Sequence, residues 1–165
     1  MKKFCGTVFP ASLLLLVLLI YFRPYYGIRH DSVLYLGQSL LRLDPDNFKS
    51  DLFFAFGSQA DFTLVPRLIA PLLGNFDAAG TFLVLTALCL VFFLLASTTL
   101  LATLFPSPYW YWGVIALLVL PGGYGEDGIL SYAEPFFTGR SLAEPLVLLA
   151  LGAYFRGRPL TAAGL

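Results

Sequence analysis

The sequence predicts an all-α, polytopic helical membrane protein with about four transmembrane helices. The first observation behind this prediction is composition. Of the 165 residues, 58% are hydrophobic and 12% are charged, whereas soluble domains have about 45–50% apolar and 25% charged residues. The second is that the apolar residues gather in four segments separated by polar loops. Because a water-soluble core of this size cannot bury so much apolar surface, the lipid bilayer is the expected surrounding and the first expected partner.

The apolar segments give the order of the expected spans. They lie at residues 4–22, 78–105, 108–120 and 142–155, with outer loops at 23–76 and 121–141. The first has no small-residue cleavage site after its apolar run and is expected to remain as an anchor. The second exceeds the roughly 20 residues that cross a bilayer, whereas the third is marginal. Residues 161–165 are expected to begin a further helix, so 1–165 is expected to be one membrane domain and a fragment of a longer protein.

Charged residues orient the expected spans. Lys2 and Lys3 precede the first span. Arg156 and Arg158 follow the fourth, so the positive-inside rule places both ends in the cytoplasm. All ten acidic residues then fall on the outer side. Five basic residues fall there too, against the rule: Arg23, Arg29, Arg42, Lys49 and Arg67. The expected location is a plasma membrane, the bacterial inner membrane, and the zero net charge argues against nucleic-acid binding.

The first outer loop is expected to carry amphipathic helices that lie on the membrane surface. Apolar residues at helical spacing predict such a helix after Asp31. Its apolar stripe consists of Val33, Leu36, Leu40 and Leu43, and its polar positions are Gln38, Ser39 and Arg42. Asp44 followed by Pro45 predicts the start of a second helical segment. Gly57 and Ser58 are expected to end it. Residues 66–74 predict a third segment, interrupted by Pro71 and closed by Gly74.

Asp31 is the first candidate for chemistry. It stands at the head of the amphipathic helix, where its carboxylate could cap the helix or take a proton from an acceptor hydroxyl. Residue type alone favours the cap. His30 is the only histidine and could assist proton transfer, and Tyr35 lies one helical turn from Asp31. A solvated histidine and an interfacial tyrosine anchor are the structural alternatives for these two.

The second outer loop carries the remaining candidates. Glu126 and Asp127 could hold a divalent cation or an acceptor, or they could form a solvated acidic turn. Arg140, at the start of the fourth span, suits bidentate contact with a phosphate, and the alternative is an anchor among lipid headgroups. Ser141 and Glu144 match the S-x-x-E capping box, which predicts a structural role for Glu144.

This layout resembles the N-terminal part of the GT-C glycosyltransferases, polytopic enzymes that use lipid-phosphate-linked sugars, such as mannosyltransferases and aminoarabinose transferases. A short basic N-terminus and one span lead into RHDSVLYLGQSLL, where Asp31 and Tyr35 match a D-E-x-x-Y-like pattern and Ser32 does not. The later stretch FFTGRSLAEPLVLLALGAYFRGRP is similar to one in which an outer-loop arginine precedes a span. The resemblance covers residues 23–159.

The resemblance implies transfer of a sugar from a polyprenyl-phosphate donor to an unknown acceptor on the outer face. It implies that Asp31 is the acceptor-activating base, that Arg140 contacts the lipid phosphate, and that Glu126 and Asp127 lie in a loop where some members carry functional acids. Because Ser32 stands in the second acidic position, no metal or other cofactor is expected. Members of this class have more than four spans, so this chain is expected to lack part of the site. The alternative is a non-catalytic assembly or scaffold protein whose outer loop binds a partner.

Overall fold

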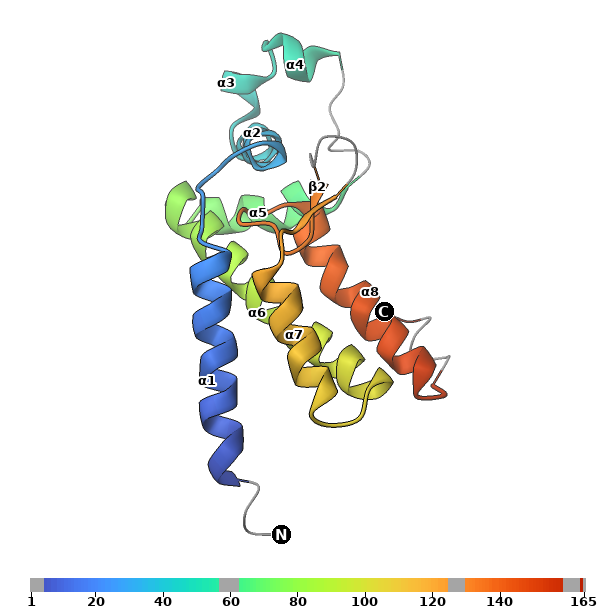
Figure 1. The fold of residues 1–165 in the computed structure, drawn as a ribbon. Helices are drawn as coiled ribbons and strands as arrows, with labels where there is room; N and C mark the ends of the chain where they lie inside the picture. The colour runs from blue at the N-terminus through green and yellow to red at the C-terminus, as the bar shows by residue number, and fades with distance from the viewer. Residues whose placement is uncertain (1–4, 57–62, 125–129, 159–163, 165) are drawn as a thin grey trace. The chain divides into compact units, whose positions relative to one another are not determined.

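The chain folds mainly into helices in the computed structural model, as the sequence predicts (Figure 1). The structure describes residues 5–56, 63–124, 130–158 and 164. Its helices are α1 (Cys5–Phe22), α2 (Asp31–Leu43), α3 (Pro45–Phe48), α4 (Leu52–Ala55), α5 (Val65–Leu73), α6 (Ala78–Leu104), α7 (Tyr109–Val119) and α8 (Gly139–Phe155). Two short strands, β1 (Gly123–Tyr124) and β2 (Leu130–Ser131), pair antiparallel. The all-α prediction did not include this small ladder.

The residues gather into two compact units. The first unit comprises residues 1–24, 88–135 and 140–165, and the second comprises residues 25–87 and 136–139. Helix α6 begins in the second unit and ends in the first. The core of the first unit is apolar and draws on α1, α6 and α7. Its buried members are Leu15, Leu19, Leu90, Phe93, Leu94, Val114, Leu118 and Ala133.

Helix α6 is the one described helix that is long and apolar enough to cross a membrane by length and composition. Its 27 residues extend about 40 Å, more than the roughly 30 Å of a hydrocarbon core. The other predicted spans form α1, α7 and α8 with bounds within three residues of the prediction. The 11 residues of α7 extend only about 16 Å. Of the about four spans that the sequence predicts, only α6 is long and apolar enough to cross a membrane in the described part of the chain.

Helices α1 and α7 lie side by side and run in the same direction (Figure 1). Near the start of α7, the hydroxyl of Tyr111 donates to the carbonyl oxygen of Ala11 at 3.5 Å. At the other end, the guanidinium of Arg23 donates to the carbonyl oxygens of Leu120 at 2.9 Å and Leu117 at 3.3 Å. The last carbonyls of a helix have no partner within it. Arg23 therefore caps α7, which gives this arginine a structural role.

The C-terminal halves of α6 and α8 also lie side by side. Arg156, just beyond α8, donates to the hydroxyl of Thr103 at 2.9 Å and to the carbonyl oxygen of Thr99 at 3.4 Å. A turn earlier, the buried Gly152 faces the backbone of Leu100, and a Cβ on Gly152 would lie 3.7 Å from the Leu100 Cα. Since a short turn joins α6 to α7, helices α1, α6, α7 and α8 alternate in direction (Figure 1).

Replacing Gly152 with leucine is expected to destabilise the first unit by about 1–3 kcal/mol, because the larger side chain overpacks the contact with α6. Replacing Gly152 with alanine is expected to leave stability close to that of the wild type, since 3.7 Å is an ordinary contact distance. Thermal unfolding of the purified full-length chain in detergent measures both variants. Equal Tm values for Gly152→Leu and the wild type would contradict close packing at this point.

In the second unit, α2 packs against α5, and its buried face is polar. Gln38 and Ser39 are fully buried, whereas Val33 and Leu43 of the predicted apolar stripe are 52% and 43% exposed. The polar positions Gln38 and Ser39 therefore face the interior of the second unit. The hydroxyl of Ser39 donates to the carbonyl oxygen of Tyr35 in its own helix at 2.7 Å and lies 3.4 Å from that of Pro66 on α5. The hydrogen bond within α2 offsets the burial of the hydroxyl.

Two predicted positions in the remainder of this loop are confirmed. Asp44 is the N-cap of α3 and Pro45 is its first residue, and Gly74 is the C-cap of α5. The predicted second segment forms two short helices, α3 and α4, and its predicted end at Gly57 and Ser58 lies outside the described residues. The predicted interruption of the third segment at Pro71 is wrong, because Pro71 stays inside α5.

Candidate functional site

Asp31 is the first residue of α2, and His30 rather than Asp31 takes the N-cap position. His30 has a φ of +47°, in the left-handed region that only a few per cent of non-glycine residues adopt. Such strained residues gather at functional sites. The half-buried Asp31 lies in the first helical turn, where the helix dipole favours a negative charge.

Residues 136–139 hold the start of α2 through two contacts. The His30 ring stacks on Phe136, with centroids 5.5 Å apart and planes at 25°. The hydroxyl of Ser32 donates to the carbonyl oxygen of Phe137 at 2.6 Å, and this bond is buried. The two contacts come from the residues on either side of the candidate base. The position of the base is therefore fixed by its sequence neighbours.

Tyr35 lies one helical turn after Asp31, as predicted, on the same helix. A Cβ on Gly139 would come within 3.1 Å of the Tyr35 hydroxyl oxygen, so the glycine allows this close approach. Three of the predicted site residues are thus gathered at the N-terminal end of α2 in the second unit: His30, Asp31 and Tyr35.

Arg140 lies in the first turn of α8 and is held by Glu134. The Arg140 Nε and one terminal nitrogen donate to Glu134 Oε1 at 3.1 Å and 2.7 Å. The Glu134 side chain is 1% exposed and that of Arg140 is 38% exposed. Removing one partner of a buried ion pair is costly because it leaves the other charge uncompensated. This pair therefore fixes the direction of the guanidinium.

Glu144 supports the turn that precedes Glu134. Its Oε2 accepts a hydrogen bond from the backbone N–H of Ala133 at 3.0 Å, and Ala133 has a φ of +49°. The predicted capping box of Ser141 and Glu144 is wrong, because α8 begins two residues before Ser141. The Glu144 carboxylate reaches back to the preceding loop instead of to the N–H of Ser141.

Arg140 and Glu144 line a pocket of about 400 Å³ in the first unit. The remaining lining residues are Phe93, Tyr124, Tyr132, Ala143, Val147 and Leu148. The ring of Tyr132 stacks on Phe93, with centroids 6.0 Å apart, and Arg23 lies 5.0 Å from the same ring. The pocket thus combines a guanidinium, a carboxylate and apolar walls. Such a lining suits a ligand whose charged or polar head is joined to an apolar part.

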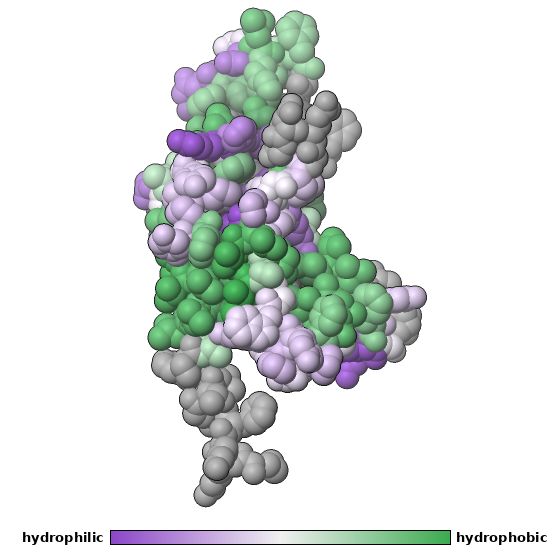
Figure 2. Space-filling view, in the orientation of Figure 1, coloured by the Kyte–Doolittle hydropathy of each residue, from purple (hydrophilic) through white to green (hydrophobic). Residues whose placement is uncertain are grey.

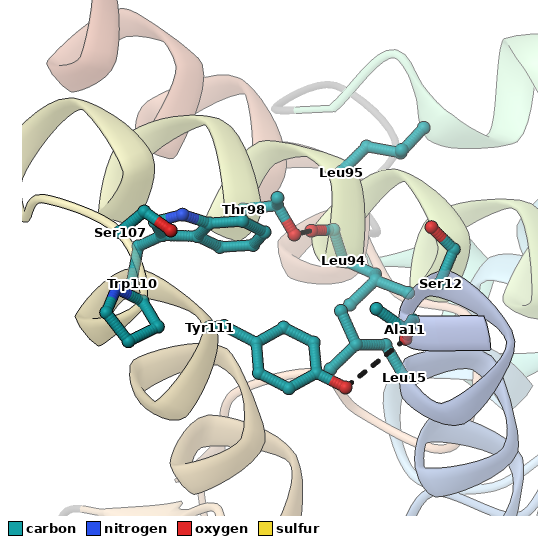
Figure 3. A pocket seen from close by; sticks show the side chains of 10 residues that line it. Ala11, Ser12, Leu15, Leu94, Leu95, Thr98, Ser107, Trp110 and Tyr111 are labelled. Atoms are coloured by element: carbon teal, nitrogen blue, oxygen red, sulfur yellow. Dashed lines mark hydrogen bonds between the residues drawn. The ribbon is translucent and has the colours of Figure 1, made fainter. Parts of the chain in front are cut away.

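A second pocket in the same unit, of about 480 Å³, has mainly apolar walls from α1, α6 and α7 (Figure 3). The Tyr111 hydroxyl points to the carbonyl oxygen of Ala11 (Figure 3). The Thr98 hydroxyl donates to Leu94 of its own helix at 2.7 Å. None of the lining residues that the structure describes is charged. The titratable group among these lining residues is the Tyr111 hydroxyl, which is already bonded to Ala11.

Glu126 and Asp127 lie outside the described residues, and their role stays a prediction. Within the described ranges, no three side chains of His, Cys, Asp or Glu form a metal-binding group, and the expected lack of a metal also stays a prediction. Sequence reasoning missed Glu134 and Glu144 as partners of the Arg140 turn. The only sequence signal for Glu134 was that this carboxylate stands six residues before an arginine. A turn can bring residues at this spacing together, whereas they do not share a face of a regular helix.

None of the family models, curated proteins or solved structures compared with the chain matches it. The resemblance to GT-C glycosyltransferases therefore stays a prediction. It rests on the sequence around Asp31 and Tyr35 and on the arginine that precedes the last helix.

Proposed function

We propose that the protein is a membrane-embedded, glycosyltransferase-like protein that transfers a sugar from a lipid-phosphate donor to an acceptor on the outer face of the membrane. The observation that carries the proposal is the Arg140 pocket. A lipid phosphate joins an anionic head to an apolar tail. The pocket offers a guanidinium, which suits phosphate, beside the aliphatic side chains of Val147 and Leu148.

Exposed apolar helix surfaces support membrane embedding. Figure 2 shows apolar side chains over the visible faces of α1 and α8. Large apolar residues are exposed on three of the helices: Leu13, Val17 and Ile20 on α1, Leu88 and Leu95 on α6, and Val147 and Leu151 on α8. Soluble monomers rarely expose contiguous apolar patches larger than a few hundred Å². Lipid contact would remove this surface from water.

The proposed chemistry assigns one step to each candidate. Asp31 accepts the proton of an acceptor hydroxyl while the acceptor oxygen forms its bond to the anomeric carbon of the sugar. The bond from that carbon to the phosphate oxygen breaks, and the lipid phosphate leaves with the electron pair. Arg140, in the first unit, is proposed to bind the phosphate of the lipid donor by charge-assisted hydrogen bonds. His30 and Tyr35 are proposed contacts of the acceptor beside Asp31.

Replacing Arg140 with glutamine is expected to weaken binding of a polyprenyl phosphate at least tenfold, because a charge-assisted hydrogen bond contributes about 1.5–3 kcal/mol. The full-length chain is reconstituted in phosphatidylcholine vesicles with a fluorescent polyprenyl phosphate, and Kd is measured by titration. Arg67→Gln makes the same charge change at an exposed position on α5 and serves as the matched control. Equal Kd values for Arg140→Gln and Arg67→Gln would refute the phosphate contact.

One observation favours the alternative of a partner-binding scaffold. Leu52 and Phe56, at α4 in the first outer loop, are 76% and 86% exposed, and Figure 2 shows apolar side chains gathered over α4 at the top of the view. An exposed aromatic cluster is typical of a protein-binding surface. A folded wild-type chain without sugar transfer would favour this second function.

A further inference from the structure

We infer that Glu144 is a positioning residue for Arg140, which it orients through the turn formed by Ala133 and Glu134. The inference rests on the proposed function, in which Arg140 contacts a phosphate. It gives a role to two carboxylates that the proposed reaction leaves unused.

The first step is the bond between Glu144 and the Ala133 backbone. Ala133 is 3% exposed with a φ of +49°, and a non-glycine residue in this region is strained by about 1–3 kcal/mol. Such a conformation persists only where surrounding contacts hold it. The carboxylate of Glu144 accepts the Ala133 N–H at 3.0 Å and supplies one such contact.

The second step passes from Ala133 to the residue that follows it. Because Ala133 and Glu134 are adjacent, the backbone conformation of Ala133 determines the direction in which the Glu134 side chain leaves the backbone. Glu134 is 1% exposed and accepts two hydrogen bonds from Arg140, both at Oε1. A guanidinium held through Nε and a terminal nitrogen cannot rotate freely about its last bonds. The direction of Arg140 at the pocket therefore depends on the Ala133 turn.

The effect of removing the charge of Glu144 on phosphate binding distinguishes a positioning role from a direct electrostatic role. Glu144 lines the pocket with Arg140, and a carboxylate near a bound phosphate repels it. If Glu144 acted only through its charge, removing that charge would tighten phosphate binding. If Glu144 acts by holding Ala133, a neutral side chain that still accepts the N–H keeps binding, and one that cannot accept it loses binding.

The test measures Kd for the fluorescent polyprenyl phosphate with four variants of the reconstituted full-length chain: Glu144→Gln, Glu144→Leu, Arg140→Gln, and the double variant Arg140→Gln/Glu144→Leu. Glu144→Gln is expected to bind as tightly as the wild type or tighter. Glu144→Leu is expected to bind roughly fivefold weaker, the equivalent of one lost hydrogen bond. In the Arg140→Gln background, the Glu144→Leu change is expected to have no further effect, because its action passes through Arg140.

Thermal unfolding of each variant shows that the comparison concerns folded protein. If Glu144→Leu does not fold, Ala133→Gly/Glu144→Leu replaces it, because glycine adopts positive φ without strain and should restore both folding and binding. Tighter binding by Glu144→Leu, or a loss that persists in the Arg140→Gln background, would overturn the positioning role and leave the phosphate contact intact. Wild-type affinity in Arg140→Gln would instead overturn the phosphate contact itself.

Discussion

Replacing Asp31 with asparagine is expected to lower the rate of sugar transfer by about 10²–10⁴-fold, the usual contribution of a general base. The amide has nearly the same shape as the carboxylate but cannot accept the acceptor proton at neutral pH. His30, rather than Asp31, is the N-cap of α2. Contacts at the start of this helix also come from His30 and Ser32. The loss should appear in kcat, and thermal unfolding of the variant beside the wild type separates a loss of catalysis from a loss of folded protein.

The measurement is release of radiolabelled sugar from a polyprenyl-phosphate-linked donor by the reconstituted full-length chain, with a membrane extract as the source of acceptor. Asp46→Asn is the matched control. Asp46 belongs to the same unit, its side chain is 88% exposed, and its ion pair with Lys49 is of the exposed kind that contributes little to stability. Similar rates for Asp31→Asn and the wild type would remove Asp31 as the base. A folded wild type with no transfer would favour the scaffold function.

The helices of the first unit could be predicted because composition and length determine them directly. Residues 78–105 were predicted as one long span and form α6 over Ala78–Leu104. The alternating directions followed from the number of apolar segments, and the contacts of Arg23 and Arg156 agree with that alternation. The basic outer residue Arg23 ran against the positive-inside rule. Its bonds to the end of α7 give a physical reason for its position, which no local pattern reveals.

The orientation of α2 could not be predicted, because periodicity identifies two faces without saying what covers each. The sequence predicts a helix that lies along the membrane surface, with Gln38, Ser39 and Arg42 as its polar positions. In the structure, the buried face carries Gln38 and Ser39. Both Gln38 amide atoms are buried without a hydrogen-bond partner, which is uncommon in folded proteins. The exposed residues of α2 include the apolar Val33 and Leu43 as well as the charged Arg42.

Local spacing predicts some residues of the candidate site, whereas the contacts that hold them depend on residues far apart in the sequence. Asp31 and Tyr35 were chosen as candidates because they are four residues apart on one predicted helix. The role of Glu144 was predicted wrongly because a capping box is a short-range rule, whereas its actual partner, Ala133, lies 11 residues earlier. The Ser32 bond to Phe137 spans 105 residues, so no sequence window could show it.

Replacing Ser32 with aspartate is the second change with a large expected effect, in this case on stability. Ser32 is the position at which the chain differs from the acidic pair of the D-E-x-x-Y-like pattern. Its side chain is 0% exposed and donates to the carbonyl oxygen of Phe137 at 2.6 Å. An ionised carboxylate has no hydrogen to donate and would face that carbonyl oxygen in a buried site. Ser32→Asp is therefore expected to destabilise the second unit by about 3–5 kcal/mol, as expected for an unpaired buried charge. Ser32→Asn introduces a side chain of nearly the same shape as aspartate but keeps an N–H donor. It is therefore expected to destabilise the second unit much less than Ser32→Asp.

The pH dependence tests whether charge is the cause. Burial would raise the pKa of the introduced aspartate above its unfolded value of about 3.9. A raised pKa in the folded state means that the folded protein binds the proton more tightly, so the deficit is small at low pH and grows as pH rises through the folded-state pKa. Chemical denaturation of the full-length variants in detergent should therefore show Ser32→Asp far below Ser32→Asn at neutral pH, with the gap closing toward about pH 4. A gap that stays constant with pH would mean that shape alone destabilises the variant, and that an acid at position 32 is excluded by packing and not by its charge.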